Sequence, residues 1–266
     1  MTTSGAPIGV FDSGVGGVSV LREIRRELPA EDLIYLADSE YTPYGDRPAA
    51  VIIERSIAMV ALLERHGVKA VVVACNTATG IAVDTLRARF TLPIVAIEPA
   101  VKPAAARTRS GVVGVLATTQ TLASERFSKL VDTHAAGVRV MTQPSPGLVE
   151  VVEAGELSTA ATRSLVEKYV RPLVDQGADT IVLGCTHYPF LGAVIQDVAG
   201  PDVTVIDPAV AVARELRRRL QTGGLLAAES RIGSERFWTT GPPAQPQAVI
   251  AKLWGTDVEV TRAPAA

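Results

Sequence analysis

The sequence has little excess charge, no long apolar run and almost no cysteine. Its 266 residues include 26 Lys and Arg against 28 Asp and Glu, a formal net charge of −2. This balance gives no electrostatic reason to expect direct nucleic-acid binding or an anionic membrane as partner. No apolar run approaches the roughly 18 residues that crossing a bilayer requires. Residues 1–7 lack the basic start and apolar core of a secretory signal. We therefore expect a cytoplasmic protein with no membrane partner.

Cysteine occurs only at Cys75 and Cys185, and the chain has no Cys-x-x-Cys pair. A zinc site uses about four Cys, His or carboxylate ligands, so the single pattern Cys185-x-His187 does not predict a metal. In a reducing cytosol the two cysteines are expected as free thiols rather than as a disulfide.

Motifs for the common cofactors are also missing. The glycine-rich turn 12–17 (Asp-Ser-Gly-Val-Gly-Gly) follows a predicted strand and leads into a predicted helix. Its spacing is not Gly-x-Gly-x-x-Gly and it has no Gly-Lys-Ser/Thr end, so it is neither the dinucleotide nor the nucleotide motif. No lysine stands in a recognisable motif for a pyridoxal phosphate Schiff base. We therefore expect no cofactor, and we expect the amides of this turn to suit a substrate carboxylate.

The chain contains an internal repeat. The two cysteine segments are 110 residues apart, and the segment Ile-Glu-Pro-Ala-Val at 97–101 returns as Ile-Asp-Pro-Ala-Val at 206–210, 109 residues later. A looser match joins 8–13 to 113–118 at a spacing of 105. Three matches in the same order at nearly constant spacing predict two structurally similar halves.

Short apolar runs alternate with amphipathic stretches along the whole chain. Predicted strands cover 8–12, 33–37, 69–74, 94–97, 112–116, 137–141, 179–184 and 203–206, and predicted helices cover 48–66, 157–175 and 208–221. Continuous apolar strands separated by helices are typical of parallel sheets that are covered on both faces.

We therefore predict an α/β fold with two similar doubly wound parallel-sheet domains and the active site in the cleft between them. Residues 1–97 plus 208–266 would form the first domain, and 98–207 the second. The tail after residue 225 reads as strand, helix and strand, and we expect it to pack back on the first domain.

Both cysteines fall at carboxyl ends of predicted strands, where sheets of this kind bind ligands. One such cysteine is more often a small core residue, but the duplication favours two thiols that face each other across a cleft. Such a pair can move a proton to or from either side of one carbon atom. His187 can exchange a proton with Cys185 near neutral pH. Asp12, if it is not an ordinary helix N-cap, is a candidate proton acceptor for Cys75.

Four segments together resemble the glutamate racemases of the aspartate/glutamate racemase superfamily. They are Phe-Asp-Ser-Gly-Val-Gly-Gly at 11–17, Pro-Tyr-Gly at 43–45, Ala-Cys-Asn-Thr-Ala at 74–78 and Gly-Cys-Thr-His-Tyr-Pro at 184–189. The match spans nearly the whole chain, and the Cys-Asn-Thr and Cys-Thr-His pair is highly specific. The resemblance implies a cofactor-independent interconversion of L- and D-glutamate that supplies D-glutamate for peptidoglycan synthesis, and thus for cell-wall biogenesis and cell shape.

The resemblance also implies roles for individual residues. Cys75 matches the thiol that takes the α-proton from the D-enantiomer, and Cys185 the thiol that acts on the L-enantiomer. Asp12 and His187 match the groups that assist them. The positions implied to bind substrate are Asp12, Ser13, Pro43, Tyr44, Gly45, Cys75, Asn76, Thr77, Thr118, Thr121, Cys185, Thr186 and His187.

A further acidic residue assists the second thiol in the family, within a Pro-x₆-Glu-x-Gly segment. Glu153 fits that spacing from Pro146. The segment departs from the usual pattern, because Ser145 stands where cysteine is frequent and Glu150 where proline is frequent. Glu150 is therefore a rival candidate.

The resemblance implies a homodimer and raises the hypothesis of an interaction with DNA gyrase, which some glutamate racemases are associated with inhibiting. Two alternatives stay open. One is a sister enzyme on the same fold, such as an aspartate or hydantoin racemase. The other is a non-catalytic protein on this fold that regulates another enzyme.

Overall fold

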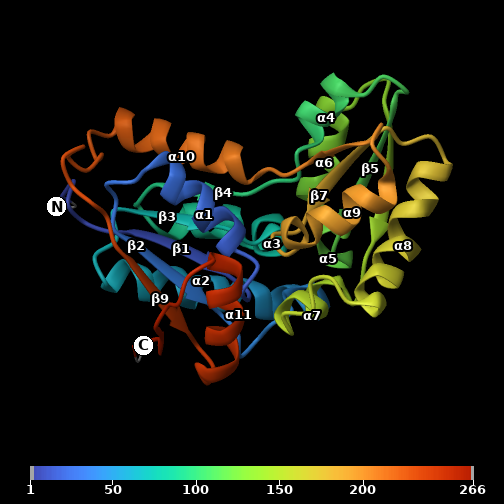
Figure 1. Cartoon of the computed structure of the whole chain (residues 1–266). Coiled ribbons are helices and arrows are strands. Elements are labelled where there is room, and N and C mark those ends of the chain that lie inside the picture. Colours follow the sequence, from blue (N-terminus) through green and yellow to red (C-terminus); the bar gives the residue numbers. More distant parts are fainter. Residues whose placement is uncertain (1–2, 265–266) are drawn as a thin grey trace.

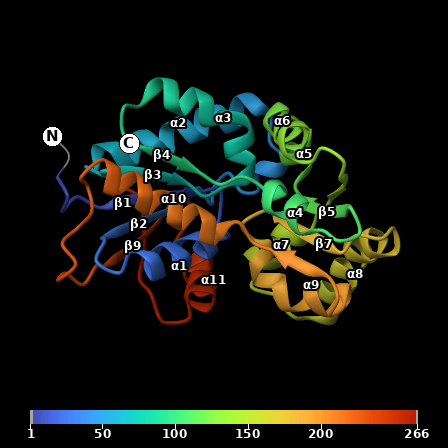
Figure 2. The same cartoon turned by 90° about the horizontal axis from the view of Figure 1, so that it is seen from above.

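The computed structural model describes residues 3–264, in which ten strands form two sheets with helices on both faces of each (Figures 1 and 2). The six-stranded sheet has the order β10-β9-β2-β1-β3-β4 and the four-stranded sheet the order β6-β5-β7-β8. Every strand pair in both sheets is parallel. The predicted α/β fold class with two doubly wound sheets is confirmed.

The strands are β1 Ile8–Asp12, β2 Leu33–Ala37, β3 Ala70–Val73, β4 Ile94–Ala96, β5 Val112–Ala117, β6 Arg139–Pro144, β7 Thr180–Gly184, β8 Thr204–Ile206, β9 Glu235–Thr239 and β10 Val260–Arg262. The α-helices are α1 Val18–Glu27, α2 Ala49–Arg65, α3 Asn76–Arg89, α4 Val101–Arg107, α5 Thr119–Ala123, α6 Glu125–His134, α7 Leu148–Glu153, α8 Ala160–Asp175, α9 Gly192–Ala199, α10 Ala209–Thr222 and α11 Ala244–Trp254. Short 3₁₀ helices cover Tyr44–Asp46 (η1) and Tyr188–Leu191 (η2). None of the helices within residues 3–264 is both long and apolar enough to span a membrane.

The larger sheet is buried on both faces at its centre, because the residues of β2 and β3 are all apolar and buried. Side chains alternate between the faces: Val72 packs with the cluster under α1, α10 and α11, whereas Val71 and Val73 pack with the cluster under α2 and α3. Figure 2 shows these two helical layers on opposite sides of the sheet. Complete burial of each such side chain contributes about 1.5–3 kcal/mol, so the two clusters are the main source of stability.

The smaller sheet repeats the topology of the larger one. The order β2-β1-β3-β4 has its equivalent in β6-β5-β7-β8, as the internal sequence matches predict. Cys75 follows β3 and Cys185 follows β7, so the two thiols stand at the carboxyl ends of equivalent strands. The first half and the second half below mean the parts of the chain built on the larger and the smaller sheet.

The C-terminal segment returns to the first sheet, as expected from its strand–helix–strand pattern. β9 pairs with β2 and β10 pairs with β9. One helix differs from its predicted start: the periodicity suggested residue 157, whereas α8 begins at Ala160. The reason is local, because the Thr159 hydroxyl accepts a hydrogen bond from the Thr162 amide at 3.1 Å and caps the helix there.

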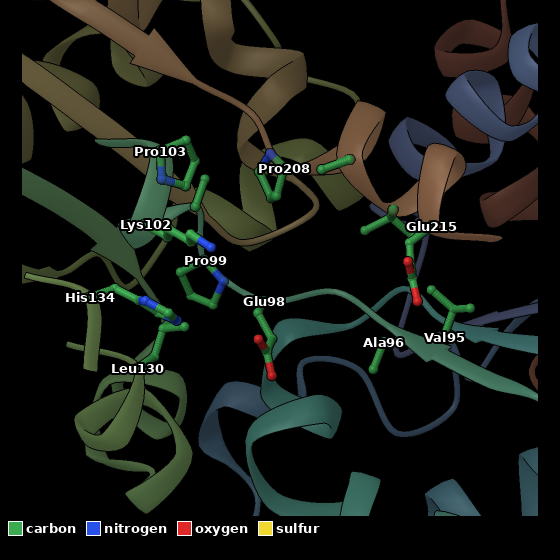
Figure 3. A pocket seen from close by; sticks show the side chains of 13 residues that line it. Val95, Ala96, Glu98, Pro99, Lys102, Pro103, Leu130, His134, Pro208 and Glu215 are labelled. Carbon is green, nitrogen blue, oxygen red and sulfur yellow. The ribbon is translucent and has the colours of Figure 1, made fainter. Parts of the chain in front are cut away.

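The chain crosses between the sheets twice, after β4 and after β8. The two crossings lie side by side at an open pocket, which is lined by Glu98 and Pro99 from the first crossing, by Pro208 from the second and by Glu215 from α10 (Figure 3). Neither cysteine lines this pocket. We propose these crossings as the boundaries of the two domains, 1–97 plus 208–266 and 98–207.

A buried ion pair ties three segments together at the amino-terminal edge of the larger sheet. Lys69 and Glu31 are both fully buried, with Nζ and the carboxylate 2.5 Å apart. Lys69 also donates to the Ser4 carbonyl at 2.6 Å, and Glu31 accepts from the Ala227 amide at 2.8 Å. The pair therefore fixes the N-terminal segment and the segment after α10 to the start of β3.

Lys69→Ala is expected to lower the free energy of unfolding by about 3–5 kcal/mol, because it leaves the Glu31 charge buried without a partner. Urea unfolding followed by circular dichroism measures this loss. The matched control is Lys129→Ala, which breaks the exposed pair with Glu125 and should change stability little. Equal effects of the two substitutions would contradict the assignment of the buried pair as a tertiary clamp.

Candidate active site

The Cys75 thiol lies at the start of α3, in the N-cap position. It donates to Ser13 Oγ at 3.5 Å and accepts from the Ala78 amide at 3.4 Å. Only 5% of Cys75 is exposed. Burial raises the pKa of Cys75 far above its ordinary value, and the negative charge of Asp12 raises it further, while the hydrogen bonds from Ser13 and Ala78 oppose the shift. Cys75 is therefore a neutral thiol at neutral pH.

Cys185 has a different set of neighbours. Its Sγ lies 3.6 Å from His187 Nδ1, and His187 Nε2 lies 2.6 Å from Glu153 Oε1. Burial lowers the pKa of His187, but hydrogen bonds with Cys185 and Glu153 outweigh it and raise the pKa well above the ordinary value. His187 is thus an imidazolium at neutral pH, placed between a sulfur and a carboxylate. We call Cys185, His187 and Glu153 the relay.

The structure distinguishes the two acidic candidates by position. Glu153, at the end of α7, reaches His187, whereas Glu150 is exposed to solvent. Among residues 3–264, no three His, Cys, Asp or Glu side chains are arranged so that they could hold a metal ion.

The glycine turn between β1 and α1 packs directly against the relay. A Cβ atom at Gly14 would lie 1.9 Å from Glu153 Oε1, and one at Gly16 would lie 2.3 Å from His187 Nδ1. Two amides of the turn already have carboxylate acceptors in the protein: Val15 donates to Glu153 Oε1 and Gly17 to Asp12 Oδ2, both at 2.8 Å. The expectation that these amides suit a substrate carboxylate is therefore wrong for Val15 and Gly17.

Asp12 is completely buried at the end of β1. Burial raises its pKa, while the positive charge of His187 and the Gly17 amide oppose that shift. Thr186 Oγ1 donates to Asp12 Oδ2 at 3.5 Å. None of the hydrogen bonds found among residues 3–264 joins Asp12 to Cys75, so the structure places Asp12 as an electrostatic neighbour of that thiol rather than as its hydrogen-bond partner.

Several buried polar atoms at the carboxyl edge of the first sheet lack a hydrogen-bond partner among the described residues. They are Asp12 Oδ1, both side-chain polar atoms of Asn76, and Thr42 Oγ1. Asn76 directly follows Cys75, and Thr42 lies against Gly14. Because buried polar groups are normally paired, this concentration beside the thiols indicates a site for a polar ligand.

Three of the predicted threonines join the two halves. Thr77 Oγ1, at the start of α3, lies 2.9 Å from Thr118 Oγ1 and 3.2 Å from Thr121 Oγ1. Thr118 caps α5 by accepting from the Thr121 amide at 3.2 Å. These hydroxyls therefore bond to one another across the two halves.

The Tyr44 hydroxyl is held by side chains of the first half. The hydroxyl donates to Asp38 Oδ2 at 2.6 Å, and Arg55 holds the same carboxylate with bonds of 2.7 and 2.9 Å. The sequence reading missed Asp38 and Arg55. A signal was available for Asp38, because it directly follows β2 at the carboxyl edge of the sheet, where Asp12 ends β1.

Pro43 and Gly45 line a narrow pocket together with Thr118 and Glu150 of the second half. The pocket measures about 20 Å³, enough for about one water molecule. Three of the predicted substrate residues line it, Pro43, Gly45 and Thr118, and it is too small for an amino acid.

Comparisons with known proteins show the family of this chain. The family model for Asp/Glu/Hydantoin racemases matches residues 8–216. The glutamate racemase of Pseudomonas paraeruginosa is 52% identical over 98% of both chains. That of Methylococcus capsulatus is 52% identical over 96% of this chain and 94% of its own.

Solved structures give the same result. Glutamate racemase isoform RacE1 from Bacillus anthracis superposes with a TM-score of 0.87 at 34% identity over 97% of both chains. The Escherichia coli glutamate racemase, solved with L-glutamate and the activator UDP-MurNAc-ala, gives 0.83 at 32% identity over 98% of this chain and 100% of its own. The Francisella tularensis enzyme, solved with D-glutamate, gives 0.85 at 28% identity over 97% of both chains. The chain therefore belongs to the Asp/Glu/Hydantoin racemase family and, within it, to the glutamate racemases.

Proposed function

We propose that this enzyme interconverts L- and D-glutamate by a two-thiol mechanism without a cofactor. The observation that carries the proposal is the pair of buried thiols, Cys75 and Cys185, at the carboxyl ends of equivalent strands. Each thiol has its own polar neighbours: Ser13 and Asp12 lie near Cys75, and His187 and Glu153 lie near Cys185. Racemisation removes a proton from one face of the α-carbon and returns a proton to the opposite face. This reaction requires one base on each side of the carbon, and the two halves supply one each.

Glutamate as the substrate is supported by the relatives and by the unpaired polar atoms. The Francisella and Escherichia coli racemases were solved with D- and L-glutamate. In this chain, Asp12 Oδ1 is suited to accept from the substrate ammonium, and Asn76 Nδ2 to donate to a carboxylate. Donors fixed around the α-carboxylate would stabilise the negative charge that develops when the α-proton leaves.

In the L-to-D direction, Cys185 as thiolate takes the α-proton, and the C–H electron pair stays on the carbon and spreads into the carboxylate. The Cys75 thiol then gives its proton to the opposite face, which produces D-glutamate and leaves Cys75 as thiolate. The D-to-L direction is the reverse. The raised pKa of Cys75 and the imidazolium at His187 match the state that is ready for L-glutamate.

Access to the site requires movement of the two halves. Cys75 and Cys185 are 5% and 7% exposed, and the pocket lined by Pro43, Gly45 and Thr118 has room for only about one water molecule. The halves must therefore separate to admit substrate and close again to exclude water during the proton transfers.

We further propose that the product D-glutamate serves peptidoglycan synthesis in the cytoplasm, which rescue of a D-glutamate-requiring bacterium would test. We propose that the enzyme works as a homodimer, which light scattering would test. We also propose that any interaction with DNA gyrase is independent of racemisation. A supercoiling assay with a Cys75→Ser variant would separate gyrase inhibition from racemisation.

The proposed reaction is tested with the wild-type enzyme in deuterated water and no added cofactor. We expect each glutamate enantiomer to be converted to the other with one deuterium at Cα, measured by chiral chromatography and mass spectrometry. The same assay with L- and D-aspartate addresses the sister activity. Faster turnover of aspartate than of glutamate, or racemisation without deuterium at Cα, would refute the proposal.

A further inference from the structure

The Cys185 side of the site is assembled from both halves of the chain. Ser19 Oγ, in the first turn of α1, lies 2.9 Å from the Thr186 carbonyl oxygen and 2.9 Å from that of Gly16. The Val15 amide donates to the same Glu153 oxygen that faces His187. The backbone of Gly16 lies against the His187 ring. Three groups of the first half thus contact the relay or Thr186, which lies between Cys185 and His187 in the sequence.

Position 16 requires glycine because the His187 ring lies close to it, and not because of its backbone conformation. Among the described residues, the glycines with positive φ do not include Gly14 or Gly16. Their conformations are open to other residues, but a Cβ atom at either position would overlap Glu153 or His187. The missing side chains therefore serve the contact between the halves.

Cys75 differs from Cys185 in this respect. Its sulfur bonds to Ser13 and Ala78, both of the first half. These bonds survive separation of the halves, whereas the bonds from Ser19 and Val15 to the second half break. One thiol keeps its immediate partners in an open enzyme, and the other loses the groups that hold its relay in place.

We propose that Val15, Gly16 and Ser19, the turn clamp, position the relay of Cys185 only when the two halves are closed. The inference rests on the proposed two-thiol function and adds that the first half provides the positioning residues for the second base. Closure then orients Glu153 through the Val15 amide, the His187 ring through the Gly16 backbone, and the Cys185 loop through Ser19. Cys185 becomes an effective base only after substrate is enclosed.

Net racemisation rates cannot reveal this asymmetry, because the two enantiomers have equal free energy and kcat/KM must change equally in both directions. Exchange of the α-proton with solvent can reveal it, because the exchange is measured for each enantiomer separately. Each enantiomer is incubated separately in deuterated water, and deuterium is measured in the recovered substrate of unchanged configuration. Cys185 governs exchange into L-glutamate, and Cys75 exchange into D-glutamate.

Gly16→Ala is expected to lower deuterium exchange into L-glutamate by about 10²-fold, because a displacement of about 1 Å at a reacting group costs that much. Ser19→Ala removes one hydrogen bond and should lower it by about 5–10-fold. Exchange into D-glutamate should stay close to the wild-type rate in both variants. The control is Gly192→Ala, in the second half, where a new Cβ has no neighbour within 4 Å and both exchange rates should be unchanged.

Equal loss of exchange into both enantiomers, or no loss in Ser19→Ala, would overturn the turn clamp. If Gly16→Ala does not fold, Ser19→Ala decides, because Ala favours the helix at least as well as Ser. A failure of the two-thiol function itself is visible separately: Cys185→Ser would then retain exchange into L-glutamate.

Discussion

Replacing either Cys75 or Cys185 by Ser is expected to lower racemisation of glutamate by about 10³-fold or more, within the range for loss of a positioned acid–base group. A serine hydroxyl has nearly the size of a thiol but is far less acidic. It therefore cannot supply the anion that removes the α-proton, although it fills the same space. Circular dichroism of the glutamate solution measures the loss in either direction.

The two variants should differ in deuterium exchange, which is the sharper result. Cys75→Ser should lose exchange into D-glutamate and retain part of the exchange into L-glutamate, and Cys185→Ser should show the opposite. Both variants should unfold near the wild-type temperature, because the substitution is nearly isosteric. Full racemisation by either variant would exclude a two-thiol mechanism.

His187→Asn is expected to reduce racemisation by about 10²–10³-fold, since His187 contacts both Cys185 and Glu153. The matched control is His66→Asn, because His66 is exposed at the end of α2. This substitution should leave the racemisation rate unchanged. Glu153→Gln should reduce activity in the same direction and Glu150→Gln should not. An unaffected Glu153→Gln enzyme would show that the His187 contact is structural only.

His187 also predicts a pH dependence. Its folded pKa is raised above the ordinary value of 6.5, so the stability it contributes is fully present below that value and is lost as pH rises through the folded pKa. Activity that requires the imidazolium should fall over the same alkaline range. His187→Asn should remove this loss of stability, measured as the unfolding temperature across pH. An unchanged profile in the variant would assign the titration to another group.

Much of the fold could be predicted because its signals are local. The segments 8–12 and 33–37 form strands with the predicted bounds, since a strand buried on both faces is apolar along most of its length. The repeat placed Cys75 and Cys185 at equivalent strand ends. The end of a strand and the polar residues after it are properties of a short segment, and they can be read without knowing the partner segments.

The site could be predicted only in part. The acidic partner of His187 stayed open between Glu153 and Glu150, which are one turn apart on α7. Because residues three apart lie on nearly the same face of a helix, helical phase alone does not say which of the two reaches His187. The sequence also did not indicate that Asp38 holds the Tyr44 hydroxyl, or that the Val15 and Gly17 amides bind carboxylates of the protein.

By itself the sequence determined two repeated parallel sheets and two thiols at matching strand ends. It also indicated the family, because the family's motifs are short segments that can be recognised without the tertiary structure. Only the tertiary structure decided how those thiols are supported. The Val15 amide meets Glu153 across 138 residues and Ser19 meets Thr186 across 167. Such contacts depend on how the two halves pack against each other, and no local pattern encodes that packing. Gly16 shows the difference: its sequence position marked a turn, and the structure showed that the turn leaves room for His187.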